Sequence, residues 1–466
     1  MKYPIISLLV SLFVIITAFS WAAELPDAVD YFTDNGYGSP VKTMQHPSGE
    51  YYKGVTYVAY QGPLEDPYVA SYHHETRKWT GPYKAGVSVL GKNAKAKLDN
   101  HGKPAMIIDD AGYIHLVFGG HGGLESHGEN PLGNTHLGRM IHVVSKEPLD
   151  ISSWKVLDNI PPFGTYNQFV KMENGDIYLF YRHGGHKSNW VYQISTDNGR
   201  TFASPVSILK TKRRTDVEAH DAWYAWFSRA QDNKIIAGYN YHLCKKEAHD
   251  GERHNCYYMV MDARDHTWRN VRGEKLTVPL TKEYADTMTQ VVDTGDLWTA
   301  RGTAALDSKG FPHVTLQVGE HMGLKGPKQM THYRWTGHKW TKGERLGPPE
   351  ADGDIRVSSP GNVSLLLAYK NDDKTGEVAW WTSADGDQRF KKGKVLIHGK
   401  KTRFAITSII RNAHPDAIVV VAGKKGGSDF TKMYLLGDNG ACQRAKADAD
   451  QLSASQKTAS KRTKQK

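Results

Sequence analysis

The chain is poor in cysteine and in long hydrophobic runs, and it shows no convincing long amphipathic helix. Three cysteines in 466 residues are too few for a fold held together by disulfide bonds. After the first 22 residues, no segment is apolar for long enough to span a membrane. The composition also excludes a coiled coil, a collagen-like chain and a wholly disordered protein.

Glycine and aromatic residues, by contrast, are abundant. The chain has 45 glycines, and aromatic residues make up 11% of it. This combination is typical of many short strands joined by tight turns. The 60 Lys and Arg residues exceed the 49 Asp and Glu residues, which gives a net charge of +11.

Residues 1–22 have the pattern of a secretory signal peptide. Lys2 supplies the positive start, an apolar run extends from Ile5 to Phe19, and Ser20 and Ala22 are the small residues expected at a cleavage site. A single membrane anchor is the alternative, but the run is short for a spanning helix. We therefore expect an exported protein, secreted or periplasmic, with no membrane segment after cleavage.

Residues 443–466 differ in composition from the rest of the chain. They are rich in Lys, Ser, Ala, Gln and Thr and contain no aromatic residue. We predict a disordered basic tail, which either has no role or attracts polyanions. Its seven basic and two acidic residues carry a charge of +5, so the body of the chain is only mildly basic.

Residues 23–442 contain a recurring unit in which a turn signal is followed by an alternating aliphatic and aromatic strand. Seven turn signals recur, and they begin at His46, Asp109, Met172, Ala230, Asp307, Ser359 and Arg411. Spacings of 52 to 77 residues suit four-stranded blades with long loops. The fold class predicted is therefore all-β, a seven-bladed β-propeller, with a β-sandwich as the alternative.

A local motif favours the propeller. The segment from Ser195 to Phe202 fits the Asp-box pattern Ser-x-Asp-x-Gly-x-Thr-Phe, found at blade hairpins of sialidase-like propellers. A decayed copy runs from Ser383 to Phe390. An ordinary Asp-Gly hairpin turn is the simpler explanation, but the motif is in phase with the repeat.

Polar residues stand at one end of the predicted hairpins in three consecutive units. The start of the first strand and the end of the second lie at the same edge of an antiparallel hairpin. Five candidates occupy these positions: His101, His121, Tyr166, Arg182 and Tyr224. We therefore expect them to gather on one face of the disc. Taken singly, each could equally be an ordinary surface or packing residue.

This set suits β-elimination on a uronic acid better than glycoside hydrolysis, which normally needs two carboxylates. Arginine or a protonated histidine would offset the uronate carboxylate and so acidify the C5 proton. A neutral histidine or an ionised tyrosine would remove that proton, and a tyrosine or histidine would protonate the departing O4.

The motifs around these residues resemble those of one known family. They are Asn100-His101-Gly102, Gly119-Gly120-His121-Gly122-Gly123, Thr165-Tyr166-Asn167, Tyr181-Arg182-His183-Gly184-Gly185-His186 and Trp223-Tyr224-Ala225. In order and blade context they are similar to the ulvan lyases of polysaccharide lyase family 25. That family is a seven-bladed β-propeller that cleaves ulvan, a sulfated polysaccharide of 3-sulfated rhamnose and glucuronic or iduronic acid.

The resemblance implies a role for each candidate. Arg182 would neutralise the uronate carboxylate, and His101 and Tyr166 would share the base and acid work. His121 and Tyr224 would hold and polarise the substrate. Three further residues are candidate substrate contacts: Asn167, His183 and Arg301.

Two His-x-Cys pairs indicate a metal site. His242 and Cys244 form one pair, and His254 and Cys256 form the other. Each pair is spaced to lie on one face of a strand, and four N/S ligands suit a structural zinc. The alternatives are a disulfide between the two cysteines or two free thiols, and His249 competes as a ligand. The resemblance implies a structural zinc in this region.

Two other classes of function compete with a secreted ulvan lyase. One is a non-catalytic polysaccharide-binding propeller, and the other is a sialidase-like hydrolase, suggested by the Asp box. Nucleic-acid binding is not expected, because the body has no basic helix or recognised motif. We expect a monomer whose partner is a sulfated anionic polysaccharide.

Overall fold

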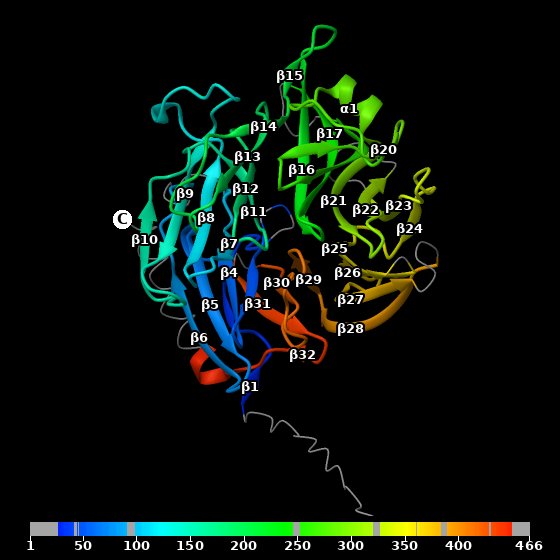
Figure 1. Ribbon diagram of the computed structural model, residues 1–466. Coiled ribbons are helices and arrows are strands. Elements are labelled where there is room, and N and C mark those ends of the chain that lie inside the picture. Colours follow the sequence, from blue (N-terminus) through cyan, green and yellow to red (C-terminus); the bar gives the residue numbers. More distant parts are fainter. Residues whose placement is uncertain are drawn as a thin grey trace, which may run out of the picture.

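The computed structural model describes residues 27–41, 44, 46–90, 98–245, 252–319, 327–359, 361–383, 389–427 and 430–449. The predicted signal peptide lies outside the described residues. Seven antiparallel sheets follow one another around a ring in sequence order (Figure 1). The predicted seven-bladed, all-β fold is therefore confirmed.

The first three blades have four strands each. The first contains β3 (Gly49–Tyr52), β4 (Val55–Gln61), β5 (Pro67–His73) and β6 (Lys78–Lys84). The second contains β7 (Ala105–Ile108), β8 (Ile114–His121), β9 (Leu137–Ser145) and β10 (Trp154–Leu157). The third contains β11 (Thr165–Lys171), β12 (Ile177–Arg182), β13 (Trp190–Ser195) and β14 (Val206–Leu209).

The fourth blade is the largest. It contains β15 (Lys212–Arg213), β16 (Ala219–Ala230), β17 (Lys234–Lys245), β18 (Glu252–Asp262), β19 (Thr267–Arg269) and β20 (Gln290–Val292). The helix α1 (Lys282–Met288) precedes β20. Among the described residues, earlier loops contain the short 3-10 helices η1 (Pro63–Glu65) and η3 (Glu125–His127).

The fifth and sixth blades return to four strands. The fifth contains β21 (Trp298–Leu306), β22 (Pro312–Gly319), β23 (Gln329–Arg334) and β24 (Glu344–Leu346). The sixth contains β25 (Asp352–Ser359), β26 (Asn362–Lys370), β27 (Thr375–Ser383) and β28 (Lys391–Lys400).

The seventh blade closes the ring with a strand from the other end of the chain. Its sheet contains β29 (Thr402–Ile406), β30 (Val419–Lys425), β31 (Phe430–Gly437), β32 (Gly440–Ala441) and the N-terminal β2 (Thr33–Tyr37). A second clasp pairs β1 (Ala28–Val29) with β33 (Arg444–Ala445). The blade is therefore complete only when both ends of the chain have folded.

The predicted tail boundary at residue 443 is wrong. Residues 443–449 continue the folded body, because Arg444 lies in β33 and its Nη1 donates to the carbonyl of Phe32 at 3.1 Å. The side chain of Ala449 is also buried. The rest of the predicted tail lies outside the described residues.

The turn signals differ in how well they predict the structure. The turns at Asp109, Met172, Ala230, Asp307 and Arg411 each join the first two strands of a blade, as expected. The signal at His46 instead leads into β3, and the turn of that hairpin is at Lys53 and Gly54. The Ser359 turn and the decayed Asp box both extend into residues outside the described ranges.

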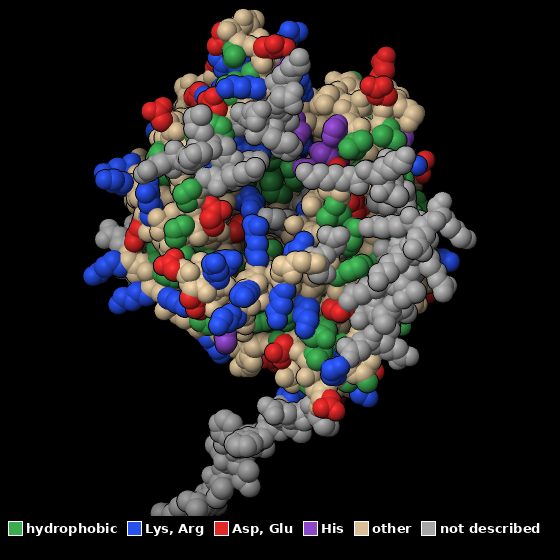
Figure 2. Space-filling view, turned by 180° about the vertical axis from the view of Figure 1, so that it is seen from behind, with side chains coloured by type: hydrophobic (Ala, Val, Ile, Leu, Met, Phe, Trp, Pro, Cys, Tyr) green, Lys and Arg blue, Asp and Glu red, His purple; other side chains and the backbone are tan. Residues whose placement is uncertain are grey.

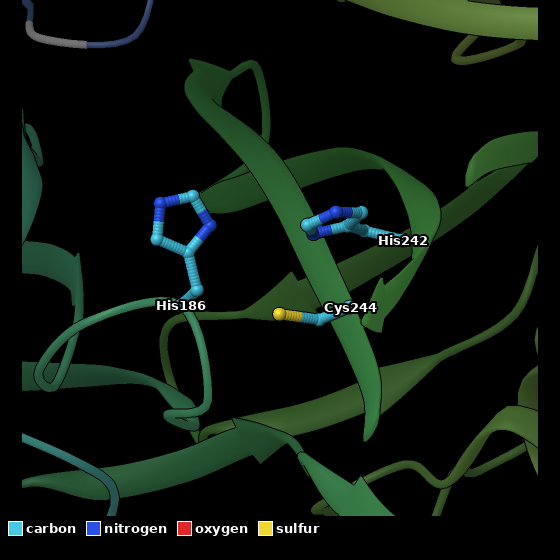
Figure 3. A group of neighbouring side chains, drawn as sticks. All are labelled: His186, His242 and Cys244. Atoms are coloured by element: carbon cyan, nitrogen blue, oxygen red, sulfur yellow. The ribbon is translucent and has the colours of Figure 1, made fainter. Parts of the chain in front are cut away.

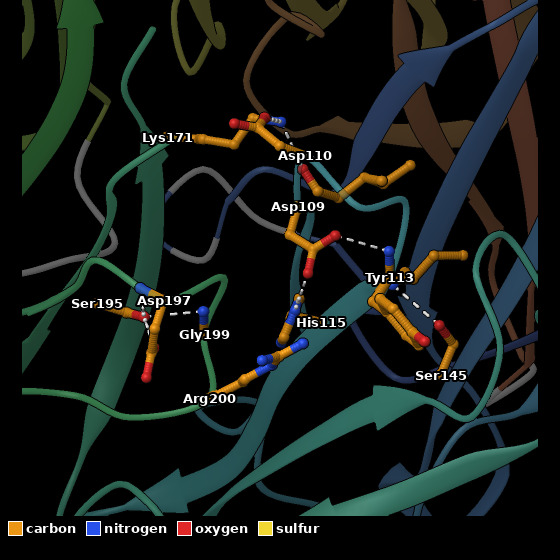
Figure 4. A network of polar contacts seen from close by, with 12 residues as sticks. Asp109, Asp110, Tyr113, His115, Ser145, Lys171, Ser195, Asp197, Gly199 and Arg200 are labelled. Carbon is orange, nitrogen blue, oxygen red and sulfur yellow. Dashed lines mark hydrogen bonds and ion pairs between the residues drawn. The ribbon is translucent and has the colours of Figure 1, made fainter. Parts of the chain in front are cut away.

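The Asp box forms the expected turn after β13. The Ser195 hydroxyl donates to Asp197 and accepts from the backbone N–H of Gly199, each at 2.8 Å (Figure 4). In the neighbouring blade, the carboxylate of Asp109 accepts from the backbone N–H of Tyr113 at 2.8 Å and lies 3.4 Å from Nε2 of His115. These side-chain bonds fix the hairpin ends on this side of the disc.

The first strands of neighbouring blades form an inner ring, in which β7 contacts β11, β11 contacts β16 and β16 contacts β21. The hydrophobic core lies between adjacent sheets. In one example, the stacked rings of Phe180 and Phe227 are 4.0 Å apart. This packing holds the starts of the inner strands close together. Within the described residues, no helix is long and apolar enough to cross a membrane.

Candidate active site

The five candidates from the second, third and fourth blades lie together. The rings of His101 and His121 stack with centroids 3.7 Å apart, and Tyr166 lies 5.6 Å from His101. The rings of Tyr166 and Tyr224 are 5.7 Å apart. The guanidinium carbon of Arg182 lies 4.9 Å from the centre of the Tyr166 ring and 5.5 Å from that of Tyr224. The prediction that these five side chains gather in one place is therefore confirmed.

A backbone irregularity in β11 presents Tyr166. The register with β12 shifts between Thr165 and Gln168, and Tyr166 has a φ of 64°. A bulky side chain in the left-handed region is strained, and such strain is concentrated at functional sites. The bulge turns Tyr166 away from the regular alternation of the strand.

Arg182 ends β12 and is fully buried. None of its three guanidinium nitrogens has a hydrogen-bond partner among the described residues. A buried cation without a paired anion is costly, so this position is built for an anionic group from outside the chain. A planar guanidinium is suited to bind a carboxylate through two parallel hydrogen bonds.

Asp99, which sequence reasoning missed, joins the two histidines. Its carboxylate lies 2.7 Å from Nδ1 of His101 and 2.6 Å from Nδ1 of His121, and it accepts from the backbone N–H of His101 at 2.9 Å. Because an ionised carboxylate only accepts, both histidines donate from Nδ1. Each imidazole is thereby held with Nε2 unprotonated. The only signal in the sequence is an acidic residue two positions before His101.

The electrostatics of the cluster favour neutral histidines and a protonated tyrosine. Burial lowers the pKa of His101 and lowers that of His121 to about 4, and in both cases the Asp99 contact opposes the shift. Burial raises the pKa of Asp99, but its hydrogen bonds from the two histidines outweigh this and hold it well below its usual range. Burial also raises the pKa of Tyr166 well above its ordinary value, and Tyr224 adds to the shift.

Comparisons with known proteins agree with this chemistry. The chain is 52% identical over 435 residues to the ulvan lyase of Nonlabens ulvanivorans. The aligned region covers 91% of this chain and 92% of that protein. It is 49% identical to the ulvan lyase of Pseudoalteromonas sp. (strain PLSV), assigned to PL25, over 92% of this chain and 90% of that one. The chain belongs to the ulvan lyases of polysaccharide lyase family 25.

Solved structures support the same assignment. A PL25 ulvan lyase structure matches with a TM-score of 0.88 and 48% identity, covering 91% of this chain and 99% of that one. The same match is found with a PL25 ulvan lyase bound to -[GlcA(1-4)Rha3S]-. Residues 131–345 also match the family described as BNR repeat-containing family member.

The three predicted substrate contacts of this lyase lie in different surroundings. Arg301 forms an ion pair with Asp352. Burial lowers the pKa of Arg301 to about 10, and the positive charges of Arg403 and Arg253 add to this shift. Asn167 is fully buried and its amide donates to the carbonyl of Val117 at 3.1 Å.

The structure does not bring His183 into the cluster. Its Nδ1 lies 2.9 Å from Oδ1 of Asn130, and its ring packs 5.6 Å from that of Tyr181. Successive side chains along a strand point to opposite sides. His183 therefore points to the same side as Tyr181 and away from Arg182. The prediction that His183 contacts substrate is therefore not supported by its position.

Of the four metal ligands predicted for the lyase, His242 and Cys244 lie together, but His254 and Cys256 do not join them. His242 pairs across the strands with Arg253, and Tyr241 pairs with His254. Directly paired residues share a face of a sheet, so His254 lies on the face opposite His242. Its Nδ1 instead lies 3.1 Å from the carbonyl oxygen of Leu297.

Cys256 also lies elsewhere, buried in a hydrophobic cluster with Trp226 and Tyr258. Both it and Cys244 are free thiols, which excludes the disulfide alternative. His242 and Cys244 are joined instead by His186, and one ligand atom from each of the three lies within 4.8 Å of the others (Figure 3). His249 lies outside the described residues.

This N/S cluster borders the active site. The ring of His242 lies 5.4 Å from that of Tyr224, and the ring of His186 lies 6.3 Å from that of His121. Arg253 stacks on Tyr224, with its guanidinium carbon 3.8 Å from the ring centre.

Figure 2 shows Lys and Arg side chains gathered around a hollow near the middle of one face of the disc. Such a face suits an anionic polysaccharide.

Proposed function

We propose that this family member, a polysaccharide lyase, cleaves ulvan by β-elimination beside a uronate held by Arg182. The bond cleaved would join 3-sulfated rhamnose to glucuronic or iduronic acid. The buried, unpartnered guanidinium of Arg182 is the observation that carries the proposal. Its contact with the uronate carboxylate would withdraw charge and acidify the proton on C5.

His101 is the base in this proposal. Because Nδ1 donates its proton to Asp99, Nε2 is the nitrogen that would accept the C5 proton. His101 is also the more exposed of the two stacked histidines, with 25% of its side chain accessible against 7% for His121. His121 would hold the substrate from within the site.

Tyr166 is the acid. Its raised pKa keeps the hydroxyl protonated at neutral pH, so it can donate to the departing O4. The electron pair of the C5–H bond forms the C4–C5 double bond as the C4–O4 bond breaks. The products are a shortened chain and a 4,5-unsaturated uronate. Solvent then reprotonates Tyr166 and removes the proton from His101, while Tyr224 positions the uronate.

The test is to incubate the protein with ulvan and follow ultraviolet absorbance. A lyase generates a conjugated double bond, so absorbance rises. A hydrolase would produce reducing ends without that rise, and a binding module would produce neither. The Arg182→Ala variant should remain folded and lose the signal, and a variant that keeps near-normal turnover would overturn the proposal.

We also propose that the lyase holds a structural zinc through His186, His242 and Cys244. Two imidazoles and a thiolate are typical zinc ligands, and their donor atoms lie within 4.8 Å of one another. Because Tyr224 packs against His242, the metal would stabilise the wall of the site. It would take no part in proton transfer.

Export and the oligomeric state complete the proposal. We propose that the chain is exported through residues 1–22, since the substrate is too large to enter a cell, and that it acts as a monomer. N-terminal sequencing of the protein released into the medium or periplasm tests cleavage near Ala22.

A further inference from the structure

A second cluster of metal-binding side chains lies where the ring closes. His74 follows β5 in the first blade, and His414 and Asp416 stand between β29 and β30 in the last blade. The ends of first and third strands lie at the hairpin edge opposite the catalytic residues. One ligand atom from each of the three residues lies within 4.8 Å of the others. We propose that they bind a divalent transition metal, with zinc preferred, that links the first and last blades.

The contacts within the last blade prepare two of the ligands. Nδ1 of His414 accepts a hydrogen bond from the backbone N–H of Asp416 at 3.2 Å, so this nitrogen is unprotonated, and a metal ion would take its lone pair in place of that long hydrogen bond. It lies 3.7 Å from Oδ2 of Asp416. Two ligands on a tetrahedral zinc with bonds of about 2.0 Å are about 3.3 Å apart. For this pair of ligands, only a small movement separates the observed geometry from that of a metal site.

Outer contacts orient the ligands. The Asn439 amide donates to Oδ1 of Asp416 at 2.8 Å, which leaves Oδ2 facing His414. The Thr56 hydroxyl lies 2.8 Å from Nε2 of His74 and fixes that ring. Partners of this kind usually hold the ligands of metal sites in place.

The two imidazoles lie against each other, and the site is open to solvent. Their centroids are 3.9 Å apart, and the rings are inclined by 34°. The side chains of His414 and Asp416 are 32% and 46% exposed, which leaves a path for the ion and room for water as a fourth ligand.

The location gives such a metal a physical role. The neighbouring contact across this seam consists of hydrogen bonds between Asn412 and the backbone of Tyr51, at 2.6 and 3.2 Å. A metal held by residues 74 and 414 would bind only the closed ring. It would therefore stabilise the folded protein by mass action.

Zinc stoichiometry tests this proposal on the full-length, untagged protein after dialysis against a chelator. Zinc titration by calorimetry should show that the wild type binds one more equivalent than the His414→Gln variant. In the wild type, zinc at about 100 times the Kd of this site should raise Tm by about 2–4 °C beyond the shift in His414→Gln. The matched control is His338→Gln, since His338 is exposed and belongs to none of the metal-type clusters among the described residues.

The control should keep both the additional equivalent and the Tm shift. Equal zinc uptake by the wild type and His414→Gln would overturn the proposal. Initial rates on ulvan should be the same for all three proteins, so the outcome is independent of the catalytic assignment. Should His414→Gln fold poorly, Asp416→Asn provides the same comparison, with loss of the additional equivalent again expected.

Discussion

At the residue scale, Asp99 decides which nitrogen of each active-site histidine carries the proton. Its carboxylate contacts Nδ1 of both His101 and His121, at 2.7 and 2.6 Å. It therefore acts through the histidines, as a positioning residue.

We expect Asp99→Asn to lower kcat by about 10²–10⁴-fold with little change in ulvan binding. An amide can donate to Nδ1 and so favour the wrong tautomer. Since Asp99 raises the pKa of His101, the acidic limb of the kcat/KM profile should move to lower pH. Steady-state rates from pH 4 to 9 check both effects. Asp265→Asn, at an exposed turn, is the matched control, and equal losses in both variants would contradict this role.

Tyr166→Phe removes the proposed proton donor and little else. The ring still packs beside Arg182 and Tyr224, so we expect unchanged Tm and binding. Turnover should fall by about 10²–10⁴-fold. Tyr83→Phe, at a residue that is 40% exposed, should behave as the wild type. Near-normal kcat in Tyr166→Phe would exclude it as the acid.

The five clustered residues could be predicted from the sequence because hairpin topology alone decides which strand ends share a face. Asp99 could not, because its position depends on a loop whose path follows no strand periodicity. His186 was missed for a similar reason. It lies in the loop between β12 and β13, and only the fold brings it to His242.

At the element scale, the register of β17 and β18 decides the zinc ligands. The spacing of His242 and Cys244 showed correctly that these two residues share a strand face. The pairing of Tyr241 with His254, which a sequence pattern does not encode, sets His254 on the other face. The register shift between Tyr239 and Tyr241 then breaks the alternation between His254 and Cys256, so the second pair does not share a face.

This register predicts that the two cysteines respond differently to substitution. Cys244→Ala should hold one equivalent of zinc fewer than the wild type and have a lower Tm, whereas Cys256→Ala should keep the wild-type zinc content, since Cys256 only packs in the core. Metal analysis of the purified proteins with thermal melts is the measurement. Zinc lost from Cys256→Ala, and kept by Cys244→Ala, would restore the ligand set expected from the sequence.

Glu50 in β3 gives the fold a pH dependence. Burial raises its pKa to about 7, against the opposing effect of Lys171, and its Oε2 accepts from the backbone N–H of Ile108 at 2.7 Å. The folded state thus binds more protons than the unfolded state between about pH 4.5 and 7. Stability contributed by this group is present below that window and is lost as the pH rises.

Glu50→Gln keeps the acceptor and removes the charge. Its free energy of unfolding relative to the wild type should therefore increase between pH 4 and 8, by as much as about 3 kcal/mol. Urea unfolding at several pH values measures this difference. For Glu125→Gln, at an exposed position, the difference in free energy of unfolding from the wild type should not change with pH. A pH-independent difference for Glu50→Gln as well would contradict the raised pKa of Glu50.

At the scale of the whole molecule, the ring depends on contacts between its two ends. The repeat predicted seven blades, but it did not predict that β2 completes the last blade or that β33 joins β1. Such long-range pairing leaves no local signal. Phe32 stacks on Trp79 at 4.6 Å across this seam and is fully buried.

Phe32→Ala should therefore destabilise the whole propeller by about 3–5 kcal/mol. Loss of the ring leaves a cavity beside Trp79, at the point where the circle closes. Denaturant unfolding followed by tryptophan fluorescence measures the effect. A loss below about 1 kcal/mol would show that the seam contributes little to stability.

The central claim is that the protein cleaves by β-elimination beside a uronate carboxylate, the group that Arg182 is proposed to bind. Ulvan whose carboxyl groups have been reduced to primary alcohols keeps its sulfates and its chain length but lacks that group. We expect the wild type to cleave native ulvan rapidly and to leave the reduced polymer intact, as measured by the fall in chain length on size-exclusion chromatography. Cleavage of both polymers at similar rates would contradict the account.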